Sequence, residues 1–143
     1  MKSEALEETQ EIKSSSLPRK KILIADDDDL MRYSIERQLI KAGFQVITAA
    51  DGGEALDHFK KNRPDLIILD LMMPYVSGPE FLHLIQARFE SEKQVPVIII
   101  SAIDPQELRE GGYKLEGYHF LPKPFGIEEL IHSVNHTLSY GSS

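Results

Sequence analysis

The chain has 143 residues, and its 16 Lys and Arg against 23 Asp and Glu give a formal net charge of −7. It has no cysteine, which excludes disulfide scaffolds, thiolate zinc sites and cysteine nucleophiles. No apolar run approaches the roughly 20 residues of a membrane span, and the acidic balance argues against direct nucleic-acid binding. The composition therefore predicts a cytoplasmic globular domain that neither inserts into membranes nor binds nucleic acid.

The two ends of the chain differ in composition from its middle. Residues 1–19 are rich in Glu and Ser and contain too few apolar residues to anchor a helix on a core. We expect residues 1–19 to form a disordered tail or linker, residues 20–139 to form one domain, and residues 140–143 to form a short C-terminal tail.

Five short apolar runs, rich in β-branched residues, alternate with segments of helical spacing. They cover residues 22–25, 46–49, 66–69, 97–100 and 118–121. Three of them are apolar at successive positions instead of alternating with polar residues. This pattern is typical of strands that are buried on both faces of a parallel sheet.

The segments between these runs carry helical patterns and helix boundaries. Apolar residues recur at helical spacing over 31–42 and 127–138, and Gly43 fits a helix stop. Three capping boxes begin at Asp51, Ser77 and Asp104. Asp29 is expected to cap the helix that follows the run of four aspartates. Five strands alternating with five helices predict an α/β three-layer sandwich.

Reactive side chains follow four of the predicted strands. Asp26 to Asp29 follow the first, Asp70 follows the third, Ser101 the fourth and Lys123 the fifth. Because the carboxyl ends of parallel strands meet at one edge, these groups should converge there. Clustered carboxylates repel one another, and a Mg²⁺ ion with oxygen ligands removes that penalty. A carboxylate can also attack phosphorus and form an aspartyl phosphate.

Four motifs then point to a known family. They are ILIADDDDLMR at 22–32, PDLIILDLMMPYVSG at 64–78, PVIIISA at 96–102 and FLPKPF at 120–125. Over residues 20–139 the chain resembles a response-regulator receiver domain, the phosphoacceptor module of two-component signalling. The resemblance implies a flavodoxin-like fold with a five-stranded parallel sheet in the order 2-1-3-4-5.

The resemblance also implies roles for individual residues. Asp70 corresponds to the phosphorylated aspartate, while Asp26 and Asp27, with Asp70 and the main-chain carbonyl of Met72, correspond to the Mg²⁺ site. The remaining positions are the Ser/Thr switch at Ser101, the aromatic switch at Phe120, the phosphoryl-pairing Lys123, and a cis peptide bond before Pro124.

Simpler interpretations apply to three aromatic and histidine residues. Phe120 is equally well explained as a core residue. His132 and His136 lie four residues apart, but without a third ligand an exposed helix face is favoured over a metal pair.

The chain also departs from the family pattern. Gly111 and Gly112 interrupt the helix that begins near Asp104, so we expect it to be short, irregular or mobile. Glu116 stands where the family usually has Gly, and Gly126 where it often has a capping Asp.

The leading hypothesis is a signalling switch. A sensor histidine kinase or phosphotransfer protein would donate a phosphoryl group to Asp70. Phosphorylation would then change partner binding on the face built by the fourth helix, fifth strand and fifth helix. The domain would catalyse its own phosphoryl transfer and dephosphorylation without being a metabolic enzyme. The output would come from an unknown protein or from a domain missing from this chain.

Two alternatives remain open. One is a pseudo-receiver scaffold that is never phosphorylated, although such proteins usually lack one of the site residues present here. The other is a Mg²⁺-dependent phosphatase of the haloacid-dehalogenase type, which also forms an aspartyl phosphate. That family needs a second Asp two residues after the nucleophile, where this chain has Met72.

Overall fold

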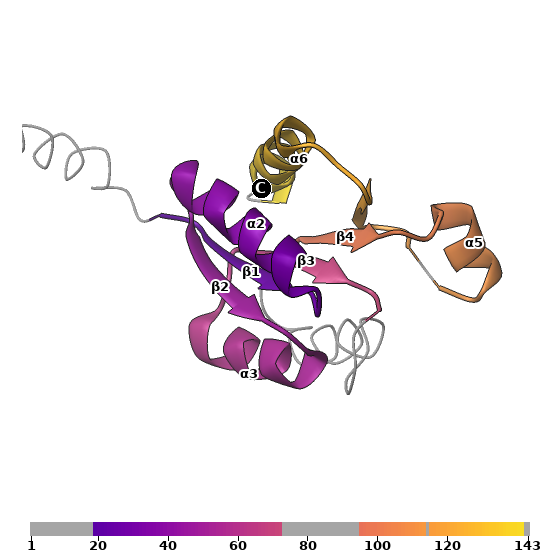
Figure 1. Ribbon diagram of the computed structural model, residues 1–143, viewed down its shortest axis with the longest axis horizontal. Helices are drawn as coiled ribbons and strands as arrows, with labels where there is room; N and C mark the ends of the chain where they lie inside the picture. The colour runs from indigo at the N-terminus through magenta and orange to yellow at the C-terminus, as the bar shows by residue number, and fades with distance from the viewer. Residues whose placement is uncertain (1–18, 73–94, 114, 142–143) are drawn as a thin grey trace, which may run out of the picture.

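The computed structural model of the protein describes residues 19–72, 95–113 and 115–141 (Figure 1). Five parallel strands form one sheet in the order β2-β1-β3-β4-β5, which confirms the predicted topology. The strands are β1 (Lys21–Ala25), β2 (Gln45–Ala49), β3 (Leu66–Asp70), β4 (Val97–Ser101) and β5 (His119–Pro122).

Helices cover both faces of this sheet, as expected for a three-layer sandwich (Figure 1). The helices are α2 (Asp29–Lys41), α3 (Gly52–Asn62), α5 (Pro105–Glu110) and α6 (Ile127–Gly141). The helix expected near Ser77 and the tail over residues 1–18 lie outside the described residues. Helix α6 extends to Gly141, so the segment expected as a tail from 140 begins within its last turn. None of the described helices has the length and apolar character needed to cross a membrane.

Two apolar cores lie on opposite faces of the sheet. Ile22 and Ile24 of β1 belong to one core together with buried residues of α2 and α6, whereas Leu23 and Ala25 belong to the other core together with buried residues of α3 and α5. Every residue of β3 and β4 is buried, and the side chains of both strands contribute alternately to the two cores. This double burial is the physical reason for the uninterrupted apolar runs in the sequence.

The start of α2 corrects one expectation. Asp28, not Asp29, is the N-cap, and its carboxylate accepts hydrogen bonds from the N–H groups of Leu30 and Met31. Asp28 has the extended backbone that an N-cap requires, whereas Asp29 already belongs to the helix. The Asp29 carboxylate instead pairs with the Arg32 guanidinium one turn later.

The glycine pair near α5 also has a different role from the one expected. Gly111 and Gly112 end the helix instead of interrupting it. Gly112 has a φ of 98°, and its N–H donates to the Arg109 carbonyl while the Tyr113 N–H donates to the Leu108 carbonyl. These two bonds form a Schellman motif, which favours glycine at the left-handed position. The result is a helix of six residues, as short as predicted.

The turn before β5 explains why glycine stands at 117 and not at 116, the position where the family usually has it. Gly117 has a φ of 85°, and the Tyr118 N–H donates to the Leu115 carbonyl at 3.2 Å. A positive φ at the third position of a four-residue turn is the signature of a type II turn, which favours glycine there. Glu116 occupies the second position, where an ordinary side chain is tolerated.

Candidate functional site

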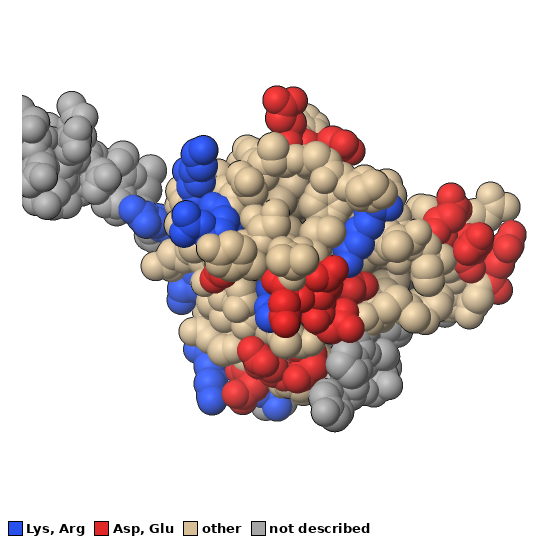
Figure 2. Space-filling view, in the orientation of Figure 1, with Lys and Arg blue, Asp and Glu red and all other residues tan. Residues whose placement is uncertain are grey.

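The reactive side chains meet at the carboxyl end of the sheet. Asp26 follows β1, Asp70 ends β3 and Lys123 follows β5. Strands β1 and β3 flank the point where the strand order reverses, and ligands of open parallel sheets bind at this crevice. Figure 2 shows acidic side chains gathered in the middle of the view, where α2 begins.

A lysine bridges two carboxylates at the centre of this site. The Lys123 Nζ lies 3.0 Å from the Asp26 Oδ2 and 3.3 Å from the Asp70 Oδ2. The Asp26 side chain is fully buried, and those of Asp70 and Lys123 are 8% and 16% exposed. Three charged groups from three separate strands thus form one largely buried network.

The second oxygen of each buried carboxylate is fixed by the backbone. The Asp28 N–H donates to the Asp26 Oδ1 at 2.9 Å, and the Met72 N–H donates to the Asp70 Oδ1 at 3.0 Å. Each carboxylate is therefore oriented from two sides, with one oxygen towards the backbone and the other towards Lys123. This leaves little rotational freedom to either group.

Asp27 completes an acidic cluster with Asp26 and Asp70. One carboxylate oxygen from each of the three lies within 4.8 Å of the others, and Asp27 is exposed while its two partners are buried. Within residues 19–72, 95–113 and 115–141, these are the only three side chains of metal-ligating type that come so close. Carboxylate oxygens suit a hard divalent cation, so the residues present fit such an ion.

Burial and, after it, the surplus of negative charge both affect the pKa values in this network. Burial raises the pKa of Asp70 to about 6, and the neighbouring charge of Asp26 adds to this, against the opposing effects of the Met72 N–H and Lys123. For Lys123, burial lowers the pKa, but the hydrogen bond to Asp26 and the charges of both carboxylates outweigh it and leave the pKa raised. An added cation would relieve the cost of ionising Asp70.

Ser101 connects the end of β4 to the lysine. Its side chain is buried, and its Oγ accepts a hydrogen bond from the Ile103 N–H at 3.0 Å. The Ser101 carbonyl accepts the main-chain N–H of Lys123 at 2.8 Å. The peptide bond between Lys123 and Pro124 is cis. Ser101 is therefore linked to Lys123 through the main chain, while its hydroxyl is held by the loop that follows β4.

Phe120 and Met72 lie at the margins of the site. Phe120 is half-buried and packs against the core between the sheet and α3. Met72 is 52% exposed, and its described contact with the site is the main-chain N–H on Asp70.

Sequence reasoning missed the part played by Arg32. Its guanidinium donates to the Asp26 main-chain carbonyl at 2.8 Å and also pairs with Asp29. Arg32 thereby ties the first turn of α2 to the loop that carries the acidic cluster. The spacing of Asp29 and Arg32, three residues apart on a helix, predicts their ion pair, but nothing in the sequence indicates the contact with the carbonyl.

Residues 22–135 match the family described as the response regulator receiver domain. The chain belongs to this family. It is 38% identical over 111 residues to the response regulator MprA of Mycobacterium sp. (strain KMS), an alignment that covers 78% of this chain and 47% of that protein. The chain therefore spans about half the length of the curated relatives that it matches.

Solved receiver structures have the same architecture. The receiver domain of Francisella response regulator 1452 is 36% identical with a TM-score of 0.74, covering 85% of this chain and 98% of that one. The chemotaxis response regulator CheY4 of Vibrio cholerae is 32% identical with a TM-score of 0.74, covering 83% and 98%. The receiver fold of this chain is thus supported over nearly the whole length of these domains.

Proposed function

We propose that this receiver domain is a phosphoacceptor switch in which Asp70 takes a phosphoryl group from the phosphohistidine of a sensor histidine kinase or phosphotransfer protein. The observation that carries this proposal is the buried network of Lys123 with Asp26 and Asp70, with Asp27 beside it. Mg²⁺ is the cation that best suits the cluster, with the main-chain carbonyl of Met72 as a further ligand.

The chemistry is a direct transfer. A carboxylate oxygen of Asp70 attacks phosphorus, the bond from phosphorus to the donor imidazole nitrogen breaks, and its electron pair leaves with the imidazole. The product is an acyl phosphate. Mg²⁺ supplies charge neutralisation when bound, and Lys123 supplies a second cation for the phosphoryl oxygens. The closeness of Lys123 to Asp70 in the unphosphorylated protein supports this role.

The switch would act through Ser101 and Lys123. The Ser101 hydroxyl would leave the Ile103 N–H and donate to a phosphoryl oxygen, and the loop after β4 would follow. Because Lys123 follows β5 directly, the same event would shift the face built by α5, β5 and α6, with Phe120 as the aromatic switch. A partner protein, or a domain outside this chain, would read that shift.

Phosphorylation by a small-molecule phosphodonor tests the proposal. With Mg²⁺, the protein should gain one phosphoryl group by intact mass, and Asp70→Asn should abolish the gain. Asp57→Asn, an exposed aspartate of α3 paired with Lys61, serves as the matched control and should label normally. Asp27→Ala should slow labelling by weakening metal binding.

Three outcomes would overturn the mechanism. Undiminished labelling of Asp70→Asn would exclude Asp70 as the acceptor, and a label on Ser101 or a histidine would assign the chemistry elsewhere. No labelling of the wild type by phosphodonor or by any histidine kinase would favour the pseudo-receiver alternative.

A further inference from the structure

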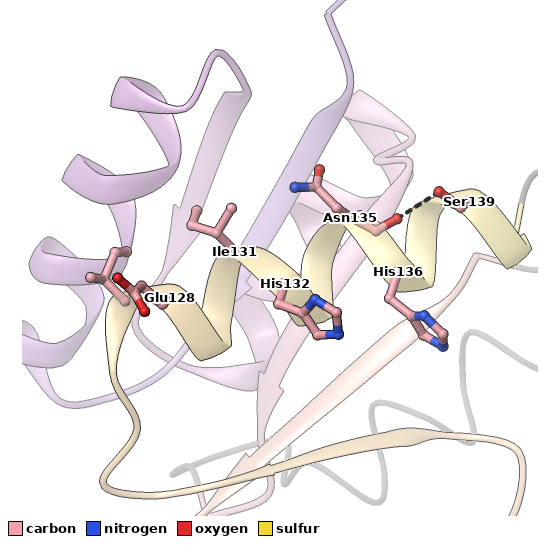
Figure 3. Close-up of a pocket in the computed structure, with 7 residues that line it drawn as sticks. Glu128, Ile131, His132, Asn135, His136 and Ser139 are labelled. Atoms are coloured by element: carbon pink, nitrogen blue, oxygen red, sulfur yellow. Dashed lines mark hydrogen bonds between the residues drawn. The ribbon is translucent and has the colours of Figure 1, made fainter.

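Three histidines gather on the side of the molecule where α6 lies beside β5. The rings of His132 and His136, one helical turn apart on α6, are stacked with centroids 6.0 Å apart and an interplanar angle of 22°. His119 of β5 meets His136 edge-on at 5.7 Å and 81°. Figure 3 shows the rings of His132 and His136 projecting from the same side of α6. We call these three residues the histidine face.

The third histidine changes the interpretation of the other two. From the sequence, His132 and His136 had no third ligand, and this favoured an exposed helix face. All three side chains are indeed exposed. The parallel pairing of β5 with β4, however, brings His119 next to α6 from a separate part of the chain.

We propose that the histidine face binds a divalent late transition-metal ion of the Zn²⁺ type through His132 and His136, with His119 as a third ligand. Histidines four residues apart lie on one helix face, and this spacing lets two imidazoles share one ion. Imidazole nitrogen is a preferred ligand of Zn²⁺ and its late first-row neighbours. This site is separate from the acidic cluster and does not depend on phosphorylation.

The geometry assigns unequal roles to the three histidines. As the rings stand, the three imidazoles do not each place a nitrogen within 4.8 Å of the others, since in the described parts of the chain only the acidic cluster meets that limit. Binding therefore needs ring rotation, which exposed side chains undergo readily. His136 lies between the other two rings and is the central ligand. His119 has to turn from its edge-on position, so it adds less affinity.

The surroundings of the histidine face favour a cation. His132 and His136 line a hollow of about 620 Å³ together with Glu128, whose carboxylate stands one turn before His132. The first turn of α6 carries Glu128 and Glu129, and its last turn carries no basic residue. Mg²⁺ prefers oxygen ligands, whereas Zn²⁺ also accepts nitrogen ligands. With both ions present, Mg²⁺ should therefore bind the acidic cluster and Zn²⁺ the histidine face.

A metal at this place would join α6 to β5. An ion that binds only the native arrangement stabilises it in proportion to its saturation. The histidine face also shares α6 and β5 with the surface proposed to signal the phosphorylated state. Zn²⁺ would therefore restrain that surface independently of Asp70.

The test uses the full chain without an affinity tag and with saturating Mg²⁺. Titration with Zn²⁺ against a chromophoric zinc indicator should show one site, and thermal unfolding should move upward with Zn²⁺. His136→Gln and His132→Gln should each weaken binding roughly tenfold or more, and His119→Gln should weaken it less. His58→Gln, on α3 and far in sequence from the histidine face, is the matched control and should bind as the wild type does.

Two results would overturn the site. One is unchanged Zn²⁺ affinity in the His132→Gln/His136→Gln double variant. The other is loss of Zn²⁺ binding in Asp27→Ala, which would place the ion in the acidic cluster. Asp70→Asn should leave Zn²⁺ binding intact, so failure of this site and failure of the phosphorylation mechanism give different results.

Discussion

The charged network at the carboxyl end of the sheet and helix α5, which follows β4, are held in place very differently. Lys123 contacts two buried carboxylates from β1 and β3, and the backbone fixes the other oxygen of each. Helix α5 has six residues, and Leu108 is its buried side chain. In the proposed function the network carries out phosphoryl transfer, which needs fixed groups, whereas α5 belongs to the surface that reports it, which needs a segment that opens at low free-energy cost.

The largest expected effect comes from removing the shared cation. Lys123→Met leaves the buried carboxylates of Asp26 and Asp70 without their counter-ion, so we expect a loss of about 3 kcal/mol in the free energy of unfolding at pH 7 without Mg²⁺. Added Mg²⁺ should restore part of this loss. Urea unfolding measures both. Lys61→Met removes an exposed pair with Asp57 and should cost no more than about 0.5 kcal/mol. Equal losses of stability in Lys123→Met and Lys61→Met would show that the Lys123 network contributes no more than an exposed ion pair.

The difference between the two regions also decides what the sequence can predict. The alternation of apolar runs and helices was sufficient to predict a parallel sheet between two helical layers, whereas the strand order came from the family resemblance. The position of Asp26, Asp70 and Lys123 after strands was sufficient to predict their convergence. These predictions rest on the geometry common to all parallel sheets. The family resemblance, not the spacing, supplied the individual roles.

Helix ends and single side-chain contacts were less predictable, because they depend on backbone torsion angles or on contacts between distant segments. Within the aspartate run, only the backbone shows that Asp28 and not Asp29 caps α2. Gly111 and Gly112 suggested a broken helix, whereas the hydrogen bonds show an ordinary helix end. His119 has no sequence signal at all, since its contact with His136 depends on how β5 packs beside α6.

Amide hydrogen exchange compares the two helices that follow β4 and β5. Helix α6 has fifteen residues and buries Leu130 and Val134 completely or nearly so, whereas α5 has six. Central amides of α6 should exchange at least roughly 100-fold more slowly than those of α5, a difference of about 2.7 kcal/mol in opening free energy. Equal, strong protection in both helices would show that α5 is as firmly held as α6.

The raised pKa of Asp70 makes the network sensitive to pH. The native state holds this proton up to a pH of about 6, while the unfolded chain releases it near 3.8. In that window the native state binds more protons, so the contribution of Asp70 to stability is lost as the pH rises from about 4 to about 6. Asp70→Asn keeps an acceptor for the Met72 N–H and removes the charge.

Without Mg²⁺, Asp70→Asn should therefore be more stable than the wild type at pH 7 by about 1–2 kcal/mol, a value discounted for the partial exposure of Asp70. The advantage should shrink as the pH falls towards 4. Urea unfolding at a series of pH values with a chelator measures it. Asp57→Asn should show no such trend, because Asp57 is exposed on α3. If the stability advantage of Asp70→Asn instead grew as the pH fell, the pKa of Asp70 would be lowered in the folded protein and not raised by burial.

The smallest expected effect concerns the end of helix α5, where two adjacent glycines provide a matched pair of substitutions. Gly112 has a φ of 98° and open space where a Cβ would stand, so Gly112→Ala costs backbone strain alone, about 1 kcal/mol. Gly111 has a φ of −79°, and its Cβ would meet the Leu108 carbonyl at 3.4 Å, an ordinary contact. Gly111→Ala should thus be neutral within about 0.5 kcal/mol. Thermal unfolding of both variants decides the point, since a Schellman end requires glycine only at 112, whereas an irregular helix would tolerate alanine equally at either position.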